Sequence, residues 1–282
     1  MSLIKPKQQD EILLNDIKSF HTDTGFKVWW LAQSGFLLKW QEKYLLHDPY
    51  LSDSLTVKYQ HTDKPHIRMS ELVINPAALD FIDIVTSSHN HTDHLDAETL
   101  MPILKNNPHI KFIIPEANRE FVVNRIKCPL GFPIGLSDGI SFEHAGFTIK
   151  GVPAAHNELE RNSKGECIYM GYVVQFGGYA IYHSGDTIWF DGLEKILRPY
   201  NVDIAFLPIN GNKPERKVAG NLNAQEAAEL GKVIDAKLVI PHHYHLFEFN
   251  TEDPASFEEE CIKRGVAYKV LEMGEGVGYE KK

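Results

Sequence analysis

The chain has 282 residues, 43% of them hydrophobic, which is enough to bury a substantial core as a single large α/β unit. Its 29 basic and 38 acidic residues give a formal net charge of −9. A field of this sign repels phosphate backbones, and no dense run of Lys or Arg offsets it, so nucleic acid is excluded as an expected partner.

Cysteine usage and apolar runs indicate the compartment. Cys128, Cys167 and Cys261 contain no CxxC pair, so neither a disulfide framework nor a thiolate zinc site is expected. Residues 1–10 are polar and lack the apolar segment of a signal peptide, and no apolar run is long enough to cross a membrane. We therefore expect a cytoplasmic protein that does not bind membranes.

The chain begins with a polar stretch and a β-meander. Residues 1–24 carry one short apolar repeat that fits a peripheral helix, so we expect an N-terminal extension followed by a single domain over residues 25–282. Three β-type runs follow, at 27–33, 36–40 and 44–46. Pro49 prevents simple continuation of the third strand.

Residues 50–76 show weak periodicity. A segment of this length without a clear pattern is often a binding loop or lid, and Arg68 is its candidate anion contact. A structural excursion that contacts no ligand is an equal alternative.

The rest of the chain alternates strand-like and helix-like segments. Strands are expected at 81–85, 111–114, 141–144, 147–152, 168–176, 179–182, 204–208, 238–240 and 267–271. Helices are expected at 97–105, 115–126, 189–197, 224–234 and 254–264, with a Pro/Gly turn region at 130–139. Both halves therefore run from a meander into βα units, which predicts an α/β fold in the form of a four-layer αβ/βα sandwich.

A charged cluster follows the apolar run that ends at Val85. His89, His91, Asp93 and His94 form an HxHxDH motif at the end of a buried strand, where α/β sheets place their chemistry. Burying such a cluster is costly unless a cation lies among the side chains. Imidazole and carboxylate are ligands of borderline divalent metals, so the motif predicts a metal site rather than a solvated polar loop.

Isolated residues at later strand ends can complete this site. His156 ends an apolar strand, and small residues before Asp186 let its backbone approach closely. After Pro241 the sequence offers His242, His243 and His245, and spacing alone does not choose among them. Asp48 and Asp96 could orient ligand histidines, although Asp96 also suits a helix cap.

The HxHxDH motif resembles the signature of the metallo-β-lactamase superfamily. The resemblance implies that His89, His91 and His156 bind one ion, that Asp93, His94 and His243 bind a second, and that Asp186 bridges them. Two divalent ions, zinc or manganese, would then generate a hydroxide nucleophile for hydrolysis. Asp93 and His243 are the candidate catalytic residues.

The carboxy-terminal motifs resemble the L-ascorbate-6-phosphate lactonase branch. These motifs are Phe206–Gly211, Gly220–Ala228, Ile240–Tyr244 and Phe249–Pro254. The resemblance implies a cytosolic hydrolase for a lactone or ester of a small sugar acid, with or without a phosphate, and a homo-oligomer. Besides Arg68, the candidate substrate contacts are Asn210, Lys213, Arg216 and His245.

Two other functions remain open at this point. A phosphodiesterase acting on a small soluble or phospholipid phosphodiester is the alternative enzyme, because the same pair of ions supports that reaction. A non-catalytic scaffold would predict lost ligands, whereas every expected ligand position is occupied. We therefore expect an enzyme that acts on a small molecule.

Overall fold

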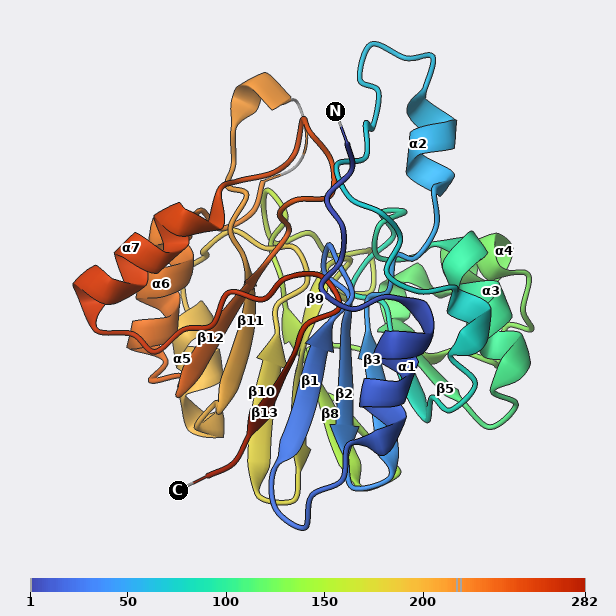
Figure 1. Ribbon diagram of the computed structural model, residues 1–282, viewed down its shortest axis with the longest axis horizontal. Helices are drawn as coiled ribbons and strands as arrows, with labels where there is room; N and C mark the ends of the chain where they lie inside the picture. Colours follow the sequence, from blue (N-terminus) through green and yellow to red (C-terminus); the bar gives the residue numbers. More distant parts are fainter. Residues whose placement is uncertain (1, 217, 219, 282) are drawn as a thin grey trace.

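The computed structural model describes residues 2–216, 218 and 220–281 and confirms a sandwich of two β-sheets between layers of helices (Figure 1). The seven-stranded sheet consists, in spatial order, of β13 (Gly276–Tyr279), β1 (Phe26–Trp30), β2 (Phe36–Trp40), β3 (Lys43–His47), β4 (Ile84–Thr86), β5 (Lys111–Pro115) and β6 (Ile134–Leu136). The six-stranded sheet consists of β12 (Leu238–His242), β11 (Ile204–Pro208), β10 (Tyr179–His183), β9 (Met170–Phe176), β8 (Phe147–Pro153) and β7 (Ser141–His144).

Each sheet joins an antiparallel meander to parallel strands. β1, β2 and β3 are antiparallel neighbours, and β3 to β6 pair in parallel. In the other sheet β7 to β10 are antiparallel, and β10 to β12 are parallel. The repeated order of elements predicted from the sequence is therefore confirmed.

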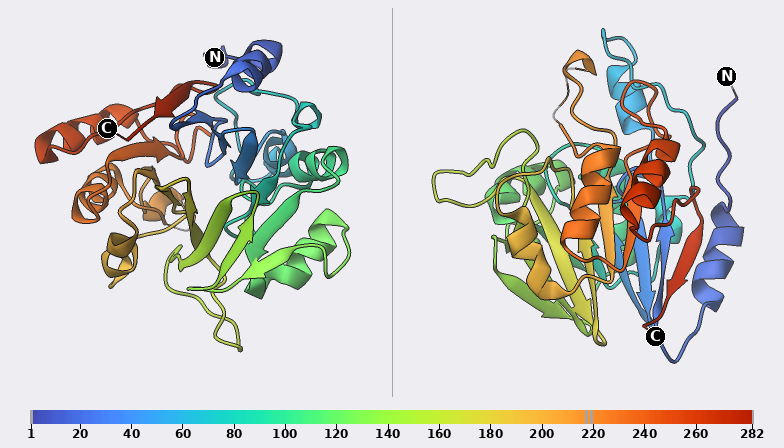
Figure 2. Two further views of the ribbon diagram at one scale, coloured as in Figure 1. Left: turned by 90° about the horizontal axis from the view of Figure 1, so that it is seen from below. Right: turned by 90° about the vertical axis from the view of Figure 1, so that its left-hand side faces the viewer.

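Helices cover the outer faces of both sheets (Figures 1 and 2). The seven-stranded sheet is covered by α1 (Asp10–Ser19), α3 (Ala97–Asn106) and α4 (Arg119–Ile126), and the six-stranded sheet by α5 (Leu193–Leu197), α6 (Ala224–Val233) and α7 (Pro254–Arg264). Single turns of 3₁₀ helix occur at η1 (Pro76–Ala78), η2 (Glu116–Asn118), η3 (Arg198–Tyr200) and η4 (Pro214–Arg216). The short α2 (Ser54–Tyr59) projects from the edge at which β3 ends (Figure 1).

Side-chain caps explain where two of these helices begin. Asn223 accepts the backbone N–H of Glu226 at 2.9 Å, and the Glu226 carboxylate accepts the N–H of Asn223 at 2.9 Å, which is a capping box. Asp253 caps α7, whose first residue, Pro254, has no N–H to satisfy. These caps place the starts of α6 and α7 at residues 224 and 254, where the sequence pattern predicted them.

The core lies between the two sheets and extends under α1. The rings of Phe36 and Phe206, one from each sheet, have centroids 4.2 Å apart. Leu13 and Ile17 of α1 are fully buried in the same hydrophobic cluster. The first helix is thus packed onto the sandwich, and the predicted boundary at residue 24 stays a prediction.

Three local predictions are corrected. Residues 267–271 form no strand, since only Tyr268 bridges to β12, and the final strand is β13, which pairs with β1 after a turn at Gly274. The Pro/Gly-rich stretch 130–139 contains the short strand β6, whose pairing with β5 is a tertiary contact. The helix expected over 189–197 begins only at Leu193, because Gly192 before it has a φ of +95°.

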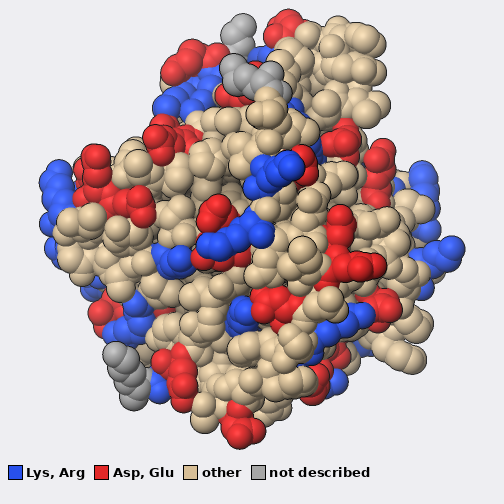
Figure 3. All heavy atoms as spheres, in the orientation of Figure 1, with Lys and Arg blue, Asp and Glu red and all other residues tan. Residues whose placement is uncertain are grey.

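The described helices and the visible surface add two observations. None of the helices in the described chain combines the length and the apolar character of a membrane span. Acidic and basic side chains intermingle over the face seen in Figure 3.

Candidate metal centre

The carboxyl ends of strands from both sheets meet at one edge of the sandwich. β4 leads into the motif at residues 89–94, β8 into His156, β10 into Asp186 and β12 into His243. Side chains far apart in the sequence are therefore brought together there. All seven predicted metal ligands belong to the clusters that result.

Gly185 allows the end of β10 to approach the motif closely. Its φ is +58°, and a Cβ at this position would lie 2.6 Å from the Cβ of Ser88 and 2.7 Å from the carbonyl oxygen of Met170. Because only glycine fits both the backbone angle and this space, the residue places Asp186 directly against the motif.

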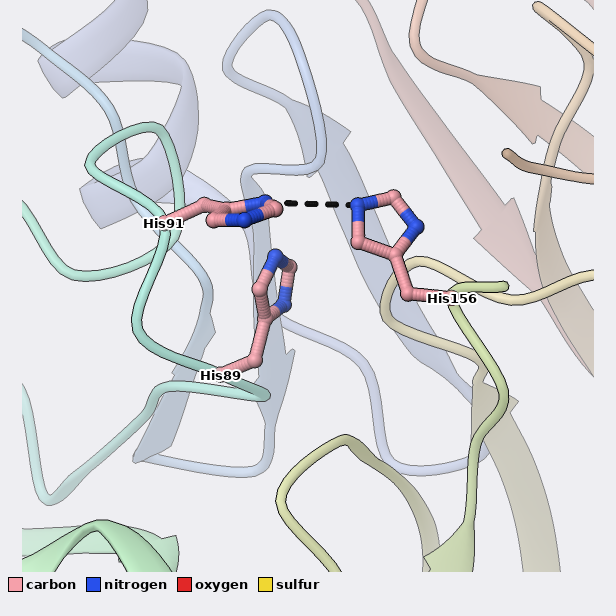
Figure 4. Close-up of side chains that lie close together, drawn as sticks. All are labelled: His89, His91 and His156. Atoms are coloured by element: carbon pink, nitrogen blue, oxygen red, sulfur yellow. Dashed lines mark hydrogen bonds between the residues drawn. The ribbon is translucent and has the colours of Figure 1, made fainter. Parts of the chain in front are cut away.

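His89, His91 and His156 form the first triad (Figure 4). One nitrogen from each ring lies within 4.8 Å of the others, and His91 Nδ1 is 3.3 Å from His156 Nε2. The carbonyl oxygen of Gly220, 2.7 Å from His156 Nδ1, can accept the ring proton and leave Nε2 as a ligand atom. Burial lowers the pKa of His89 well below its ordinary value and that of His156 to about 4, so both rings are neutral at pH 7.

Asp93, His94 and His243 form the second triad. The Asp93 Oδ2 atom lies 3.7 Å from His94 Nε2 and 3.6 Å from His243 Nε2. Burial raises the pKa of Asp93, but the positive charge that His94 and His243 can carry outweighs it, so the pKa is lowered overall. The carboxylate is therefore ionised at neutral pH.

Asp186 lies between the two triads. Its Oδ1 is 3.2 Å from His94 Nε2, and its Oδ2 is 3.3 Å from His243 Nε2 and 3.5 Å from His156 Nε2. Burial alone would raise the pKa of Asp186, but His243 and His94 hold it well below its ordinary value. One carboxylate thus faces nitrogen atoms of both triads.

The donor atoms fit divalent metal ions. His89 Nε2 is buried and has no hydrogen-bond partner among the described residues, and His94 Nε2 and Asp186 Oδ1, 3.2 Å apart, are buried without a well-aligned hydrogen bond. Unpaired buried polar atoms are costly, and two ionised carboxylates in one buried cluster are more so. Imidazole nitrogens and carboxylate oxygens are the ligands that zinc and manganese take, and a cation would satisfy all of these atoms.

Asp48, at the end of β3, holds the ring of His94. Its Oδ2 is 2.7 Å from His94 Nδ1, while its Oδ1 accepts the backbone N–H of Ser88 at 3.1 Å and the hydroxyl of Thr86 at 3.2 Å. This contact fixes Nδ1 as the protonated nitrogen and leaves Nε2 for the second triad. The orienting position predicted for Asp48 agrees with this geometry.

Asp96 is a helix cap, which is the second of the two roles that the sequence allows for it. Its side chain accepts the backbone N–H of Thr99 at 2.9 Å and the hydroxyls of Ser52 and Ser54 at 2.7 and 2.8 Å. It is therefore the cap of α3 and contacts no ligand histidine in the described part of the chain.

Gln33 is a site residue that the sequence analysis missed. Its side chain is almost fully buried, and Nε2 donates to Asp93 Oδ2 at 2.7 Å and lies 3.0 Å from His243 Nε2. The backbone carbonyl oxygen of Gln33 also accepts the backbone N–H of His243 at 3.1 Å. The only sequence signal is a polar residue at the end of the apolar run 27–33, which is too common to be specific.

The structure distinguishes His243 from His242 among the histidines after Pro241. His243, with a φ of +69°, joins the second triad. His242 is fully buried, with Nδ1 3.1 Å from the hydroxyl of Ser34 and its ring stacked on His183 at 5.3 Å. His183 and His242 thus lie in the core beneath the triads rather than facing a substrate.

A cavity of about 430 Å³ opens onto both triads. Besides ligand residues, it is lined by Leu55, Lys58, Tyr59, Lys64, His66, Asn90, Thr92, Arg125, Val218, Phe247, Phe249 and Asn250. Five of these come from the segment 50–76, so the stretch with weak periodicity does border the site. Most of the others belong to loops whose position the sequence pattern could not give.

The five predicted substrate contacts are not among the residues that line this cavity. They are Arg68, Asn210, Lys213, Arg216 and His245. Arg68 instead donates to Asp53 at 2.6 Å, and Lys213 pairs with Glu252 at 2.6 Å. These charges are matched by local carboxylates, which a sequence cannot show.

Two of the five, Asn210 and Arg216, lie behind the residues that line the cavity. Asn210 donates to the side-chain oxygen of Asn250 at 2.8 Å, and Arg216 donates to the carbonyl oxygen of Thr251 at 2.6 Å. Asn250 does line the cavity. Asn210 and Arg216 therefore support the wall of the cavity instead of facing it.

Comparison with known proteins agrees with this fold and donor set. A family model described as a beta-lactamase superfamily domain matches residues 27–243, so the chain belongs to the metallo-β-lactamase superfamily. Its relatives include a UPF0173 metal-dependent hydrolase of Methanosarcina mazei, 31% identical over 89% of this chain and 96% of the relative. Another from Methanosarcina barkeri is 30% identical over 89% and 97%. The chain is accordingly a metal-dependent hydrolase.

Solved structures support the fold. Igni18, a metallo hydrolase from Ignicoccus hospitalis, has a TM-score of 0.68 at 23% identity and covers 92% of this chain and 100% of its own. An isothiocyanate hydrolase from Delia radicum gut bacteria has a TM-score of 0.70 at 20% identity, covering 90% and 100%. At these identities the likeness concerns architecture alone.

Proposed function

We propose that this hydrolase holds two divalent cations, zinc or manganese, one in each triad, with Asp186 shared between them. The observation that carries the proposal is the position of Asp186, whose two oxygens face His94, His243 and His156 at 3.2 to 3.5 Å. A carboxylate can contact two ions at once, whereas each imidazole here offers one nitrogen.

The chain's own residues supply proton transfer and positioning. Bound divalent cations would lower the pKa of water toward neutrality and polarise a carbonyl or phosphoryl oxygen. Asp93, whose side chain is 16% exposed, is the proton acceptor. Its contacts with Gln33, His94 and His243 all involve Oδ2, so within the described residues Oδ1 remains available to take up a proton. His243 holds the second triad together beside it.

For the substrate we propose a lactone or ester of a small sugar acid, with or without a phosphate. The motifs similar to the L-ascorbate-6-phosphate lactonase branch support it, because 206–211 and 240–244 follow or end strands at the metal edge, and 249–254 contributes Asn250 to the cavity. A cytoplasmic location and a homo-oligomeric state remain predictions from the sequence.

The test combines metal analysis with a substrate panel. Purified protein is analysed for bound metals, re-metallated with zinc or manganese, and assayed on sugar-acid lactones, simple esters and phosphodiesters. Two ions per chain with preferential lactone or ester hydrolysis would support the proposal. One ion per chain would contradict the shared position of Asp186, and preferential phosphodiester hydrolysis would favour the alternative enzyme. Bis(p-nitrophenyl) phosphate alone does not discriminate, because dinuclear sites often accept it.

A further inference from the structure

The cavity wall differs in charge from the chain as a whole. The chain has 29 basic and 38 acidic residues, yet Lys58, Lys64 and Arg125 line the cavity. Among the described lining residues, the only carboxylates are those of Asp93 and Asp186, which face the triads. With cations held by those carboxylates, the field inside the cavity is positive, and such a field concentrates anions.

Arg125 is anchored next to the metal-binding motif. Its Nη1 donates to the carbonyl oxygens of Asn90 and Leu95 at 2.7 and 3.2 Å, on both sides of Asp93 and His94 in the sequence. The hydrogen bonds that the described residues make with this guanidinium use Nη1 alone, so the N–H groups of Nε and Nη2 remain for a ligand. Arg125 therefore presents a fixed positive group in the cavity beside the metal-binding motif.

An aromatic cluster borders the same cavity. The His66 ring stacks on Tyr59 at 4.3 Å and contacts Phe249 and Phe247 edge-on at 4.5 and 5.2 Å. Lys58 Nζ lies 4.9 Å from the centroid of Tyr59, so a cation stands at the edge of this cluster. Aromatic faces of this kind pack against planar or apolar ligand groups.

We propose that the substrate is an anionic lactone or ester whose body presents a planar or apolar face. The reacting group lies at the triads, the body packs against the cluster of Tyr59, His66 and Phe249, and Lys58 and Arg125 bind the anionic group. The volume of about 430 Å³ suits a molecule of this size. This inference rests on the proposed function for the reacting group, but the binding of the other two parts can be measured without turnover.

The experiment uses three compounds that share a phosphonate as their metal-binding group. Methylphosphonate, phenylphosphonate and 4-carboxyphenylphosphonate are titrated into the metal-loaded protein by calorimetry at low salt. The phenyl ring should improve affinity about tenfold over the methyl group through apolar burial. The added carboxylate should improve it about fivefold further through Lys58 and Arg125.

Matched variants locate these gains. Lys58→Gln should remove most of the gain from the carboxylate, whereas Lys105→Gln, an exposed lysine on α3, should leave it intact. Phe249→Ala should reduce the gain from the phenyl ring without changing methylphosphonate binding. Equal affinities for the three phosphonates, no binding of any of them, or equal effects of the two lysine variants would overturn the inference. Failure of the proposed function alone would appear as absent lactone and ester turnover with these binding differences retained.

Discussion

The Nδ1 atom of His94 lies 2.7 Å from Oδ2 of Asp48, and both side chains are fully buried. A metal-binding imidazole needs such a partner on its second nitrogen, because the partner fixes the tautomer and the ring plane. Asp48 directly follows β3 and His94 lies in the loop after β4, so the parallel pairing of these two strands creates the contact.

We expect Asp48→Asn to weaken metal binding by about ten- to a hundredfold, since the amide is uncharged and supports His94 less strongly. The measurement is a competition titration with a chromogenic chelator. Asp80→Asn, which changes an exposed carboxylate, is the control and should leave metal affinity unchanged. An affinity for Asp48→Asn within twofold of wild type would count against the orienting role.

Asp186→Ala should lose one or both ions while retaining the fold, because the change removes the carboxylate that faces both triads. Elemental analysis gives the metal content, and far-ultraviolet circular dichroism checks the fold. Asp191→Ala, an exposed neighbour five residues later, is the control. Full metal occupancy in Asp186→Ala would rule out the bridging position.

Gln33→Met should weaken metal binding about tenfold, because it keeps the length of the side chain but removes the amide that donates to Asp93. The same chelator competition reads the effect, and Gln175→Met on the exposed face of β9 is the matched control. If the two variants bind metal equally well, Gln33 has no positioning role.

Gly185→Ala should destabilise the protein more than Gly178→Ala. Both glycines have positive φ, which costs a substituted alanine about 1–2 kcal/mol. A Cβ at Gly178 has no atom within 4 Å, whereas one at Gly185 meets Ser88 at 2.6 Å. Thermal unfolding of both variants isolates the contact, and equal melting temperatures would show that the approach to Ser88 is not tight.

Removal of metal should make stability sensitive to acid through His156. Burial lowers the pKa of this ring from 6.5 to about 4, so between these values the unfolded chain binds a proton that the folded chain does not. The contribution is intact above pH 6.5 and is lost as pH falls toward 4, by about 3 kcal/mol in total. His94, whose pKa is raised above its ordinary value, acts in the opposite sense.

The corresponding measurement compares chelator-treated wild type with His156→Gln. The free energy of unfolding is measured at pH 7 and at pH 5. From pH 7 to pH 5 it should fall by about 2 kcal/mol more in the wild type than in His156→Gln. Identical pH dependence in the two proteins would show that the His156 ring is protonated in the folded state.

Much of the fold could be read from local patterns. Alternating apolar runs gave the strands of both meanders, and the helix-like pattern from residue 254 gave the start of α7. The last strand could not be read in this way, because β13 is a Gly/Val segment whose pairing with β1 depends on a contact across the whole chain. Short strands such as β6 likewise depend on their neighbour rather than on their own sequence.

The same division applies to the site. The HxHxDH motif determined the chemistry of the centre, since spacing within one tight turn fixes which side chains converge. Spacing alone did not choose between His242 and His243; the family resemblance indicated His243, and the structure gives a physical reason, because a φ of +69° at His243 separates the directions of the two adjacent rings. Arg68 and Lys213 stay predicted substrate contacts, but the sequence could not show that their side chains pair with Asp53 and Glu252.

The amino-acid sequence by itself thus determined the fold class and the kind of metal-binding side chains. The fold class follows from periodicity, and the metal-binding side chains follow from residue types spaced closely in the sequence. Only the tertiary structure decided that Lys58 and Arg125 border the cavity and that Gln33 contacts Asp93. Their positions depend on how separate loops pack at the common edge of two sheets, and no local pattern encodes that packing.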